Sequence, residues 1–557
     1  MRGVRNLYFA WTWLAAAVLS AQQKPLSRQQ DVPKPETCTI EGRIVNAVTG
    51  QPVNKADIIL SRSGGPTNQR YTTTTGTGGR FAMQNIEPAK YYLGVSKRGY
   101  AQIQYGARGA GKPGAALSLD PGQHLGDIVL RMSPQAVIMG RVLDEDGDPV
   151  PFVGIQLLRY TFTRGKRQLQ QVDDGGTNDL GEYRLYGLSP GKYYLSATAN
   201  TGMGGQEYDS GQAYAPTYYP GTSNPSTAAS VELQPGTVVR GADITLVRAR
   251  TVRVRGRVVD PLTKGSPQPA NVSLQARGNW EGMFWASMAS NSDLKGNFEI
   301  RGVVPGEYTV QAFKRSADGK NYIAMQAIDV HEADVDNIVL EFSPPAELKG
   351  RLSVEGRMLP ANTDPQINLE LTGSSMGWPG AGSVKADGSF TLSNVTPSRY
   401  QVHIFGIPED YYIKSVRLGD KDVLESGLDF TAGATGTLEI VVSSNGGQIE
   451  GVVLNADEQT VSAARVVLVP DEPRRAQSRF YRDASTDQYG RFTIKGIAPG
   501  GYKLFAWEDV EDGAYENPEF LKPFEALGEA KSIREGSRES AQLKLIPAQT
   551  AKAVPGN

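Results

Sequence analysis

One pattern occurs five times along this chain of 557 residues, and it limits the fold more than any other feature. Each copy opens with an alternating run centred on a glycine, at Gly42, Gly140, Gly256, Gly350 and Gly451. An aromatic residue follows, with a proline seven positions later and a tyrosine ten positions later. The five sets are Phe81/Pro88/Tyr91, Tyr183/Pro190/Tyr193, Phe298/Pro305/Tyr308, Phe390/Pro397/Tyr400 and Phe492/Pro499/Tyr502. A spacing kept without insertion in five copies indicates five copies of one folding unit.

Each copy has the pattern of short β-strands. The residues two before and two after each glycine are apolar, the period-two alternation of a strand with one buried face. The glycine shares that face, where the missing side chain permits a neighbouring element to approach closely. A second alternating run, a Gly-x-aromatic turn, a proline step and a closing apolar run indicate further strands. The glycines are 98, 116, 94 and 101 residues apart, and about a hundred residues with seven or so strands is the size of a β-sandwich with its own core.

We therefore predict an all-β protein of five tandem Ig-like β-sandwiches, arranged like beads on a string after a signal peptide. A short amphipathic helix near 517–535 is expected to pack on the fifth sandwich, because Phe520, Leu521, Phe524 and Leu527 share helical spacing. The expected ranges are signal peptide 1–21, linker 22–37, sandwiches 38–133, 134–249, 250–343, 344–444 and 445–547, and tail 548–557.

The N-terminus has the features of a secretory signal. Arg2 and Arg5 precede the apolar run Leu7–Leu19, and small residues end at Ala21. The run has 13 residues, and a membrane span needs about 20. We expect an exported protein, periplasmic or extracellular at the cell surface, with no stable membrane span after cleavage. An uncleaved anchor is the competing interpretation.

Composition and motifs argue against several functions. The 58 basic and 59 acidic residues balance to a formal net charge of −1, which leaves no basic field for nucleic acid. The single cysteine, Cys38, excludes an intrachain disulfide. None of the three histidines, His124, His331 and His403, belongs to a zinc-binding pair. The segment Gly187–Gly191, "GLSPG", matches a serine-hydrolase pattern but occupies the repeated proline turn. We predict a non-enzymatic protein with no catalytic residue, metal or cofactor.

The repeated residues also carry a family resemblance. The pattern I-x-G-R-V, then G-x-F, then P-G-x-Y-x-L-x-A, resembles the carboxypeptidase regulatory-like domain over nearly all of residues 39–547. The resemblance implies a prealbumin-like, carbohydrate-binding-like sandwich that is common in exported bacterial proteins. It is a resemblance to the accessory domain and not to the zinc-binding catalytic one. The fourth copy departs from the pattern at Ser398, where a glycine usually follows the proline.

Two glycine-rich loops contain more aromatic residues than the repeat requires. Such rings can stack on sugar faces, or they can cover the open end of a sandwich and pack between domains. With the resemblance, they make polysaccharide the leading ligand class, and envelope proteins the other candidate partners. The alternative function is a structural spacer or an envelope assembly and adhesion scaffold without a small ligand. The candidate ligand-binding residues are Tyr208, Tyr214, Tyr218 and Tyr219 in Thr201–Gly221, and Trp280 and Trp285 in Arg277–Met288.

Overall fold

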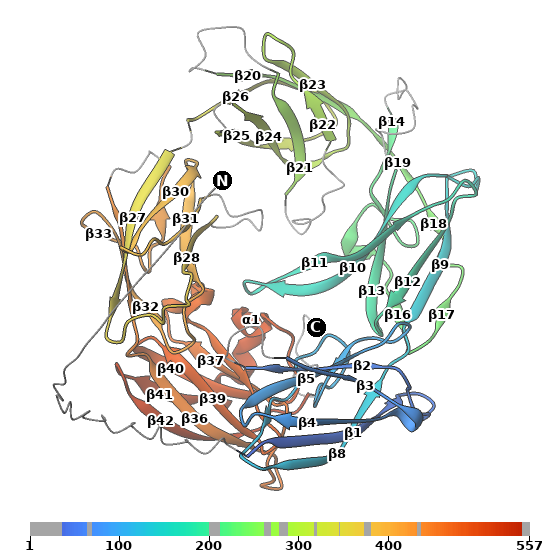
Figure 1. The fold of residues 1–557 in the computed structure, drawn as a ribbon. Coiled ribbons are helices and arrows are strands. Elements are labelled where there is room, and N and C mark those ends of the chain that lie inside the picture. The colour runs from blue at the N-terminus through green and yellow to red at the C-terminus, as the bar shows by residue number, and fades with distance from the viewer. Residues whose placement is uncertain are drawn as a thin grey trace, which may run out of the picture.

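The fold was analysed in a computed structural model of the chain. The structure describes residues 36–63, 70–199, 212–260, 269–277, 288–316, 320–344, 346–371, 380–431 and 436–548. The regular structure is almost entirely β (Figure 1), which confirms the predicted all-β class. The signal-peptide prediction for 1–21 lies outside the described residues. Within them, no helix is long and apolar enough to cross a bilayer.

The first copy consists of two sheets. One has the order β4-β1-β8, with β1 antiparallel to β4 and parallel to β8. The other has the order β3-β2-β5-β6, and β7 also pairs with β5. The strands are β1 (Cys38–Asn46), β2 (Asp57–Arg62), β3 (Arg70–Thr74), β4 (Arg80–Ile86), β5 (Lys90–Ser96), β6 (Ile103–Gln104), β7 (Leu117–Ser118) and β8 (His124–Met132).

The second copy repeats this plan and adds a long hairpin. Its sheets have the orders β12-β9-β17 and β11-β10-β13-β15, with β18 on β9, β16 on β13, and a separate pair β14-β19. The strands are β9 (Ala136–Leu143), β10 (Val153–Thr163), β11 (Lys166–Gly176), β12 (Glu182–Leu188), β13 (Gly191–Ala199), β14 (Gln212–Ala215), β15 (Thr217–Tyr218), β16 (Val231–Leu233), β17 (Val238–Val239), β18 (Ile244–Thr245) and β19 (Val247–Arg250).

The third and fourth copies keep the two-sheet arrangement. The third has sheets β23-β20-β26 and β22-β21-β24-β25, and the fourth has β30-β27-β35-β32-β33 and β29-β28-β31-β34. The strands of the third are β20 (Val252–Val259), β21 (Asn271–Ala276), β22 (Met288–Asn291), β23 (Asn297–Val303), β24 (Gly306–Arg315), β25 (Asn321–Val330) and β26 (Val335–Glu341). Those of the fourth are β27 (Ala346–Glu355), β28 (Gln366–Leu371), β29 (Ala381–Ser383), β30 (Ser389–Val395), β31 (Arg399–Phe405), β32 (Tyr412–Leu418), β33 (Lys421–Asp422), β34 (Leu428–Asp429) and β35 (Leu438–Ser443).

The fifth copy has sheets β39-β36-β42 and β38-β37-β40-β41. The helix predicted near 517–535 is shorter than expected: α1 (Pro518–Leu521) continues as a 3-10 helix (Lys522–Leu527), and the remainder forms β41, which pairs with β40. Phe520, Leu521 and Phe524 are buried as predicted, whereas Leu527 is exposed. The strands are β36 (Gly447–Leu454), β37 (Arg465–Pro470), β38 (Arg482–Ser485), β39 (Arg491–Ile497), β40 (Gly500–Trp507), β41 (Glu529–Ile533) and β42 (Arg538–Lys544).

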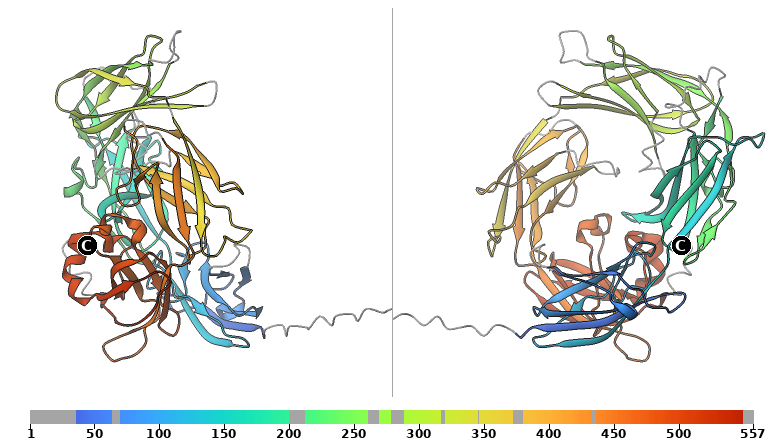
Figure 2. Two further views of the ribbon diagram at one scale, coloured as in Figure 1. Left: turned by 90° about the vertical axis from the view of Figure 1, so that its left-hand side faces the viewer. Right: turned by 45° about the vertical axis from the view of Figure 1, so that its right-hand side comes forward.

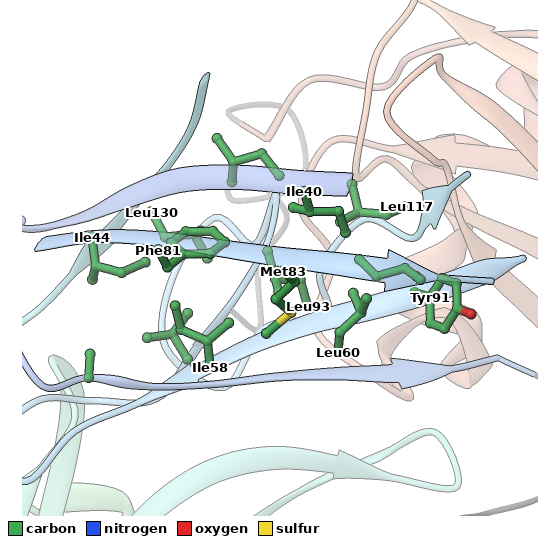
Figure 3. Packing of buried hydrophobic residues seen from close by; sticks show 14 of the residues in the cluster. Ile40, Ile44, Ile58, Leu60, Phe81, Met83, Tyr91, Leu93, Leu117 and Leu130 are labelled. Atoms are coloured by element: carbon green, nitrogen blue, oxygen red, sulfur yellow. The ribbon is translucent and has the colours of Figure 1, made fainter. Parts of the chain in front are cut away.

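The core of each copy lies between its two sheets. In the first copy, Ile40, Ile44 and Phe81 from one sheet meet Ile58 and Leu93 from the other (Figure 3). Each of the other copies has a corresponding cluster built from its own residues. The residues predicted to point inward around the repeat glycines are all buried: Ile40, Ile44, Ile138, Val142, Val254, Val258, Leu348, Leu352, Ile449 and Val453. The domain boundaries proposed from the sequence remain predictions.

The repeat glycine lies where three strands come closest together. In every copy it is paired directly with the repeat aromatic on the neighbouring strand, as Gly42 is with Phe81. A Cβ added at Gly42 would lie 2.3 Å from the carbonyl oxygen of Ile128 on β8 and 2.9 Å from the Phe81 ring. The other four glycines are similarly enclosed, each by its aromatic partner and a backbone carbonyl. This carbonyl belongs to the closing strand in three of them and, for Gly140, to Ala242 between β17 and β18. The glycine is therefore required by packing on both sides.

The repeat tyrosine closes the same core with one hydrogen bond. In all five copies its hydroxyl donates to the carbonyl of the residue four positions earlier, which directly precedes the proline. Tyr193 is 4% exposed, and its hydroxyl donates to the carbonyl of Ser189 at 2.8 Å. The ring that covers Gly140, however, is that of Tyr183, because Tyr183 is its direct cross-strand partner.

Replacing Gly42 with alanine should destabilise the first copy by about 1–3 kcal/mol, the usual range for overpacking. The β8 carbonyl cannot move away without breaking the parallel ladder. Gly94→Ala on β5 is the matched control, because a Cβ there would meet only the Ile59 carbonyl oxygen, at 4.0 Å. Hydrogen exchange of residues 38–132 in the full chain should accelerate in Gly42→Ala alone. Equal exchange in the two variants would contradict the packing argument.

A fragment of residues 134–249 should fold alone, since its core cluster is drawn from these residues. Within it, Tyr193→Ala should lower the free energy of unfolding by about 3–5 kcal/mol through lost core packing. Tyr193→Phe should lower it by about 1 kcal/mol, because only the hydroxyl bond to Ser189 is removed. Urea unfolding followed by circular dichroism measures both. A loss below about 1 kcal/mol for Tyr193→Ala would mean that the ring is not part of the core.

Candidate functional site

The first and fifth copies pack against each other. The five copies therefore form a ring in which the blue and red ends meet (Figures 1 and 2), rather than the predicted open string. At this seam the Ser118 hydroxyl donates to Asp487 at 3.0 Å, and the Gln123 amide donates to the Tyr489 hydroxyl at 2.8 Å. Two ion pairs extend the contact, Arg108–Glu508 at 2.8 Å and Lys112–Asp509 at 3.0 Å.

The long hairpin of the second copy also reaches the fifth copy. β10 and β11 have 11 residues each, and their turn lies near α1 at the inside of the ring (Figure 1). The Asn517 amide donates to the Gly165 carbonyl at 2.6 Å, and the Phe162 and Phe520 rings lie 6.2 Å apart. Arg164 at the tip pairs with Glu370 of the fourth copy. The hairpin thus connects three copies.

A cleft of about 460 Å³ lies where the first, fourth and fifth copies meet. Lys90 and Tyr92 of β5 line it from the first copy, His403 and Tyr411 from the fourth, and Arg479, Arg482 and Lys495 from the fifth. A second cleft of about 400 Å³ lies between the first and fifth copies and shares Tyr92 and Asp483 with it. We call the first space the junction cleft. Tyr92 is 36% exposed, so its ring is accessible from the cleft.

An arginine-rich segment of the fifth copy forms one wall of the junction cleft. The sequence "RRAQSRFYR" (474–482) holds four arginines and no acid, a signal that the sequence interpretation above did not use. Arg474 pairs with Glu425 at 2.8 Å, and Arg475 pairs with Glu525. Burial lowers the pKa of Arg479 to about 10 and also lowers the pKa of Arg482.

His403 lies at the same junction. It lies outside the core of its own sandwich and faces the cleft. Burial lowers its pKa to about 4, and the nearby Arg479 and Arg164 add to the effect. Its Nε2 atom lies 2.6 Å from a carboxylate oxygen of Glu370.

The structure places three of the candidate sugar-binding tyrosines against the second sandwich. Tyr218 is 1% exposed and packs with Leu158 and Leu169, so its ring has no free face for a ligand, and its assignment as a binding residue is corrected. Tyr214 and Tyr219 are half-buried against the core, and the Tyr214 ring lies beneath the Arg248 guanidinium. Tyr214, Tyr218 and Tyr219 thus contribute to packing of the second sandwich. Tyr208, Trp280 and Trp285 lie outside the described residues.

No group of three or more His, Cys, Asp or Glu side chains suited to a metal ion occurs in the described ranges. The acidic turn at Asp144–Asp148 is held by its own backbone. A carboxylate oxygen of Asp144 accepts from the amides of Asp146 and Asp148 at 3.0 and 2.8 Å. Glu145 pairs with Arg248 at 2.6 Å.

The fold and the repeated motif define a protein of tandem β-sandwiches. The family model of the carboxypeptidase regulatory-like domain matches residues 39–126, so the first copy is similar to that domain. A search of curated proteins found no match to the chain.

Three solved structures are similar to this chain at low overall similarity. The TIE protein of Bacillus anthracis is 12% identical over 55% of this chain and 51% of its own, with a TM-score of 0.16. This chain thus spans about half the length of that protein. The minor pilin GBS52 of Streptococcus agalactiae is 14% identical over 38% and 95% of the two chains, with a TM-score of 0.23. A streptococcal ancillary pilin is 13% identical over 56% and 100%, with a TM-score of 0.19.

Ring closure can be tested by crosslinking across the seam. Gln123→Cys with Tyr489→Cys should react with a short bismaleimide, because the native side chains touch, while the buried Cys38 stays protected. Lys295→Cys with Tyr489→Cys is the control, since the third copy lies across the ring (Figure 1). Adding Arg108→Glu and Lys112→Glu should lower the yield, because like charges would face Glu508 and Asp509. Equal yields for the seam pair and the control pair would contradict a closed ring.

Proposed function

We propose that this protein is an exported, non-enzymatic binding scaffold in which five sandwiches hold a ligand site at their junction. One observation carries the proposal: the accessible polar and aromatic side chains of three copies converge on the junction cleft. Ligand sites form preferentially at interfaces between domains, where a few polar groups surround a concave space. A ring sets the relative positions of the copies, so a site shared by them is preorganised.

The ligand class that we favour is carbohydrate. Support comes from the type of domain in the first copy and from Tyr92, an accessible ring among hydrogen-bonding side chains. A single ring can contribute about 0.5–1.5 kcal/mol by stacking. Trp280 and Trp285 remain candidates for a second contact.

A spacer or envelope assembly scaffold without a small ligand is the second candidate. The burial of Tyr218 and the packing of Tyr214 and Tyr219 favour it, because these rings stabilise the sandwich instead of presenting a platform. Export rests on the N-terminal sequence and belongs to both candidates.

A glycan array with the mature full-length chain separates the two candidates. Binding of a neutral or acidic glycan, weakened about three- to tenfold by Tyr92→Ala, is expected if the junction cleft is the site. Tyr186→Ala is the matched control, because Tyr186 is 67% exposed on the second copy, away from the cleft. Binding that is lost only in Trp280→Ala and Trp285→Ala would move the site to that loop. No binding across the array would favour the spacer.

A further inference from the structure

The junction cleft contains cationic side chains whose charge is not balanced by neighbours. Lys90, Arg479, Arg482 and Lys495 line it from two copies. Among the described residues, none of the four has a carboxylate within ion-pair distance. The flanking Arg474 is different, since it pairs with Glu425 at 2.8 Å. The positive charge of the cleft is therefore a local feature and not a property of the whole segment.

The acidic side chains of the cleft do not neutralise these cations. Asp483 is already engaged by Arg465, at 2.9 Å. Glu409 is exposed at the edge, and no other carboxylate lines the space. Because Arg465 also pairs with Asp512 at 3.0 Å, it offsets the charge of Asp483 only in part. The four cationic and two acidic side chains that line the cleft leave an excess of two positive charges. Because the whole chain has a formal net charge of −1, this excess is concentrated at the junction.

Arg479 and Arg482 have more hydrogen-bond donors than neighbouring acceptors occupy. The Nε atom of Arg479 is buried without a hydrogen-bond partner in the described structure, and its Nη2 donates only to the side-chain oxygen of Gln477. Arg482 donates to the backbone carbonyls of Arg479 and Tyr481 at 2.7 and 3.0 Å. A desolvated guanidinium without an anion is unfavourable, because neither its charge nor all of its donors are satisfied. A bound anion would supply what is missing.

We propose that the junction cleft is a site for an anionic ligand, in which Arg479 and Arg482 contact a carboxylate or phosphate group. A guanidinium presents paired donors that match both groups. Lys90 and Lys495 add attraction from opposite sides of the seam, so occupancy also strengthens the contact between the first and fifth copies. This inference rests on the proposed binding function and specifies its ligand. The accessible Tyr92 ring fits an anionic group carried on a sugar.

Titration calorimetry on the mature full-length chain tests the inference with three probes. They are oligogalacturonate for carboxylate, tripolyphosphate for phosphate and cellotetraose as the neutral sugar. At least one anion should bind, and 0.5 M salt should weaken it, because exposed charge pairs are screened. Lys90→Gln with Lys495→Gln should weaken that anion by about tenfold. Lys192→Gln with Lys349→Gln changes the net charge equally outside the cleft and should leave affinity unchanged.

Arg479→Lys supplies a second test that keeps the charge. It removes the paired donors, so the affinity for the anion should fall while the crosslinking yield of the seam pair stays the same. If only one of the two anions binds, that result shows whether the cleft recognises a carboxylate or a phosphate group. The inference would be overturned if both lysine double variants lost the same affinity for the anion. It would also be overturned if neither the lysine nor the arginine substitutions changed that affinity. If cellotetraose binds and neither anion does, the anionic site is wrong and the binding function stands. If no probe and no arrayed glycan binds, both are wrong.

Discussion

The close approach of three strands at the repeat glycine is the constraint on which the rest of the structure depends. The glycine has the closing strand on one side and an aromatic ring on the other. The closing strand runs parallel to the first strand in the copies, as β8 does to β1. Parallel first and last strands place the entry and the exit of the chain at opposite ends of a sandwich. Consecutive copies must therefore follow one another end to end.

The fixed spacing of the motif follows from the strand that it spans. The strand that begins one residue before the repeat aromatic has seven residues in every copy, as in β4 and β39. One end is held by the ring over the glycine, and the other by the turn in which the tyrosine hydroxyl bonds to the residue before the proline. An insertion between these points would turn every following side chain to the other face of the sheet. The spacing of the motif is therefore fixed because both ends of this strand are held in place.

Apolar periodicity was sufficient to predict the strands and cores, because burial acts on every second residue. It could not predict the ring. The seam is made by side chains such as Ser118, Gln123 and Tyr489, which have no period and are also common on free surfaces. The aromatic loop of the second copy shows a different limit, since Tyr218 could either stack on a ligand or fill a core. Only its position over Leu158 and Leu169 decides for the core. The arginines of 474–482 were visible in the sequence. Which of them has a carboxylate as an ion-pair partner depends on Glu425 and Glu525, which lie 49 and 50 residues away from Arg474 and Arg475 in the chain.

The junction is built from the parts in which the copies differ. The connection after the second strand of a sandwich is a long hairpin in the second copy and the arginine-rich segment with its 3-10 turns in the fifth. The helical segment between β40 and β41 belongs to the fifth copy as well, and its Phe520 packs with Phe162 of the hairpin and Trp507 of β40. Repeated positions thus stabilise each sandwich, and variable positions bring separate sandwiches together. A site that draws Lys90 from the first copy and Arg482 from the fifth can exist only when the ring is closed. Binding at the proposed junction site would then be linked to ring closure, because a ligand that binds only the closed form stabilises it.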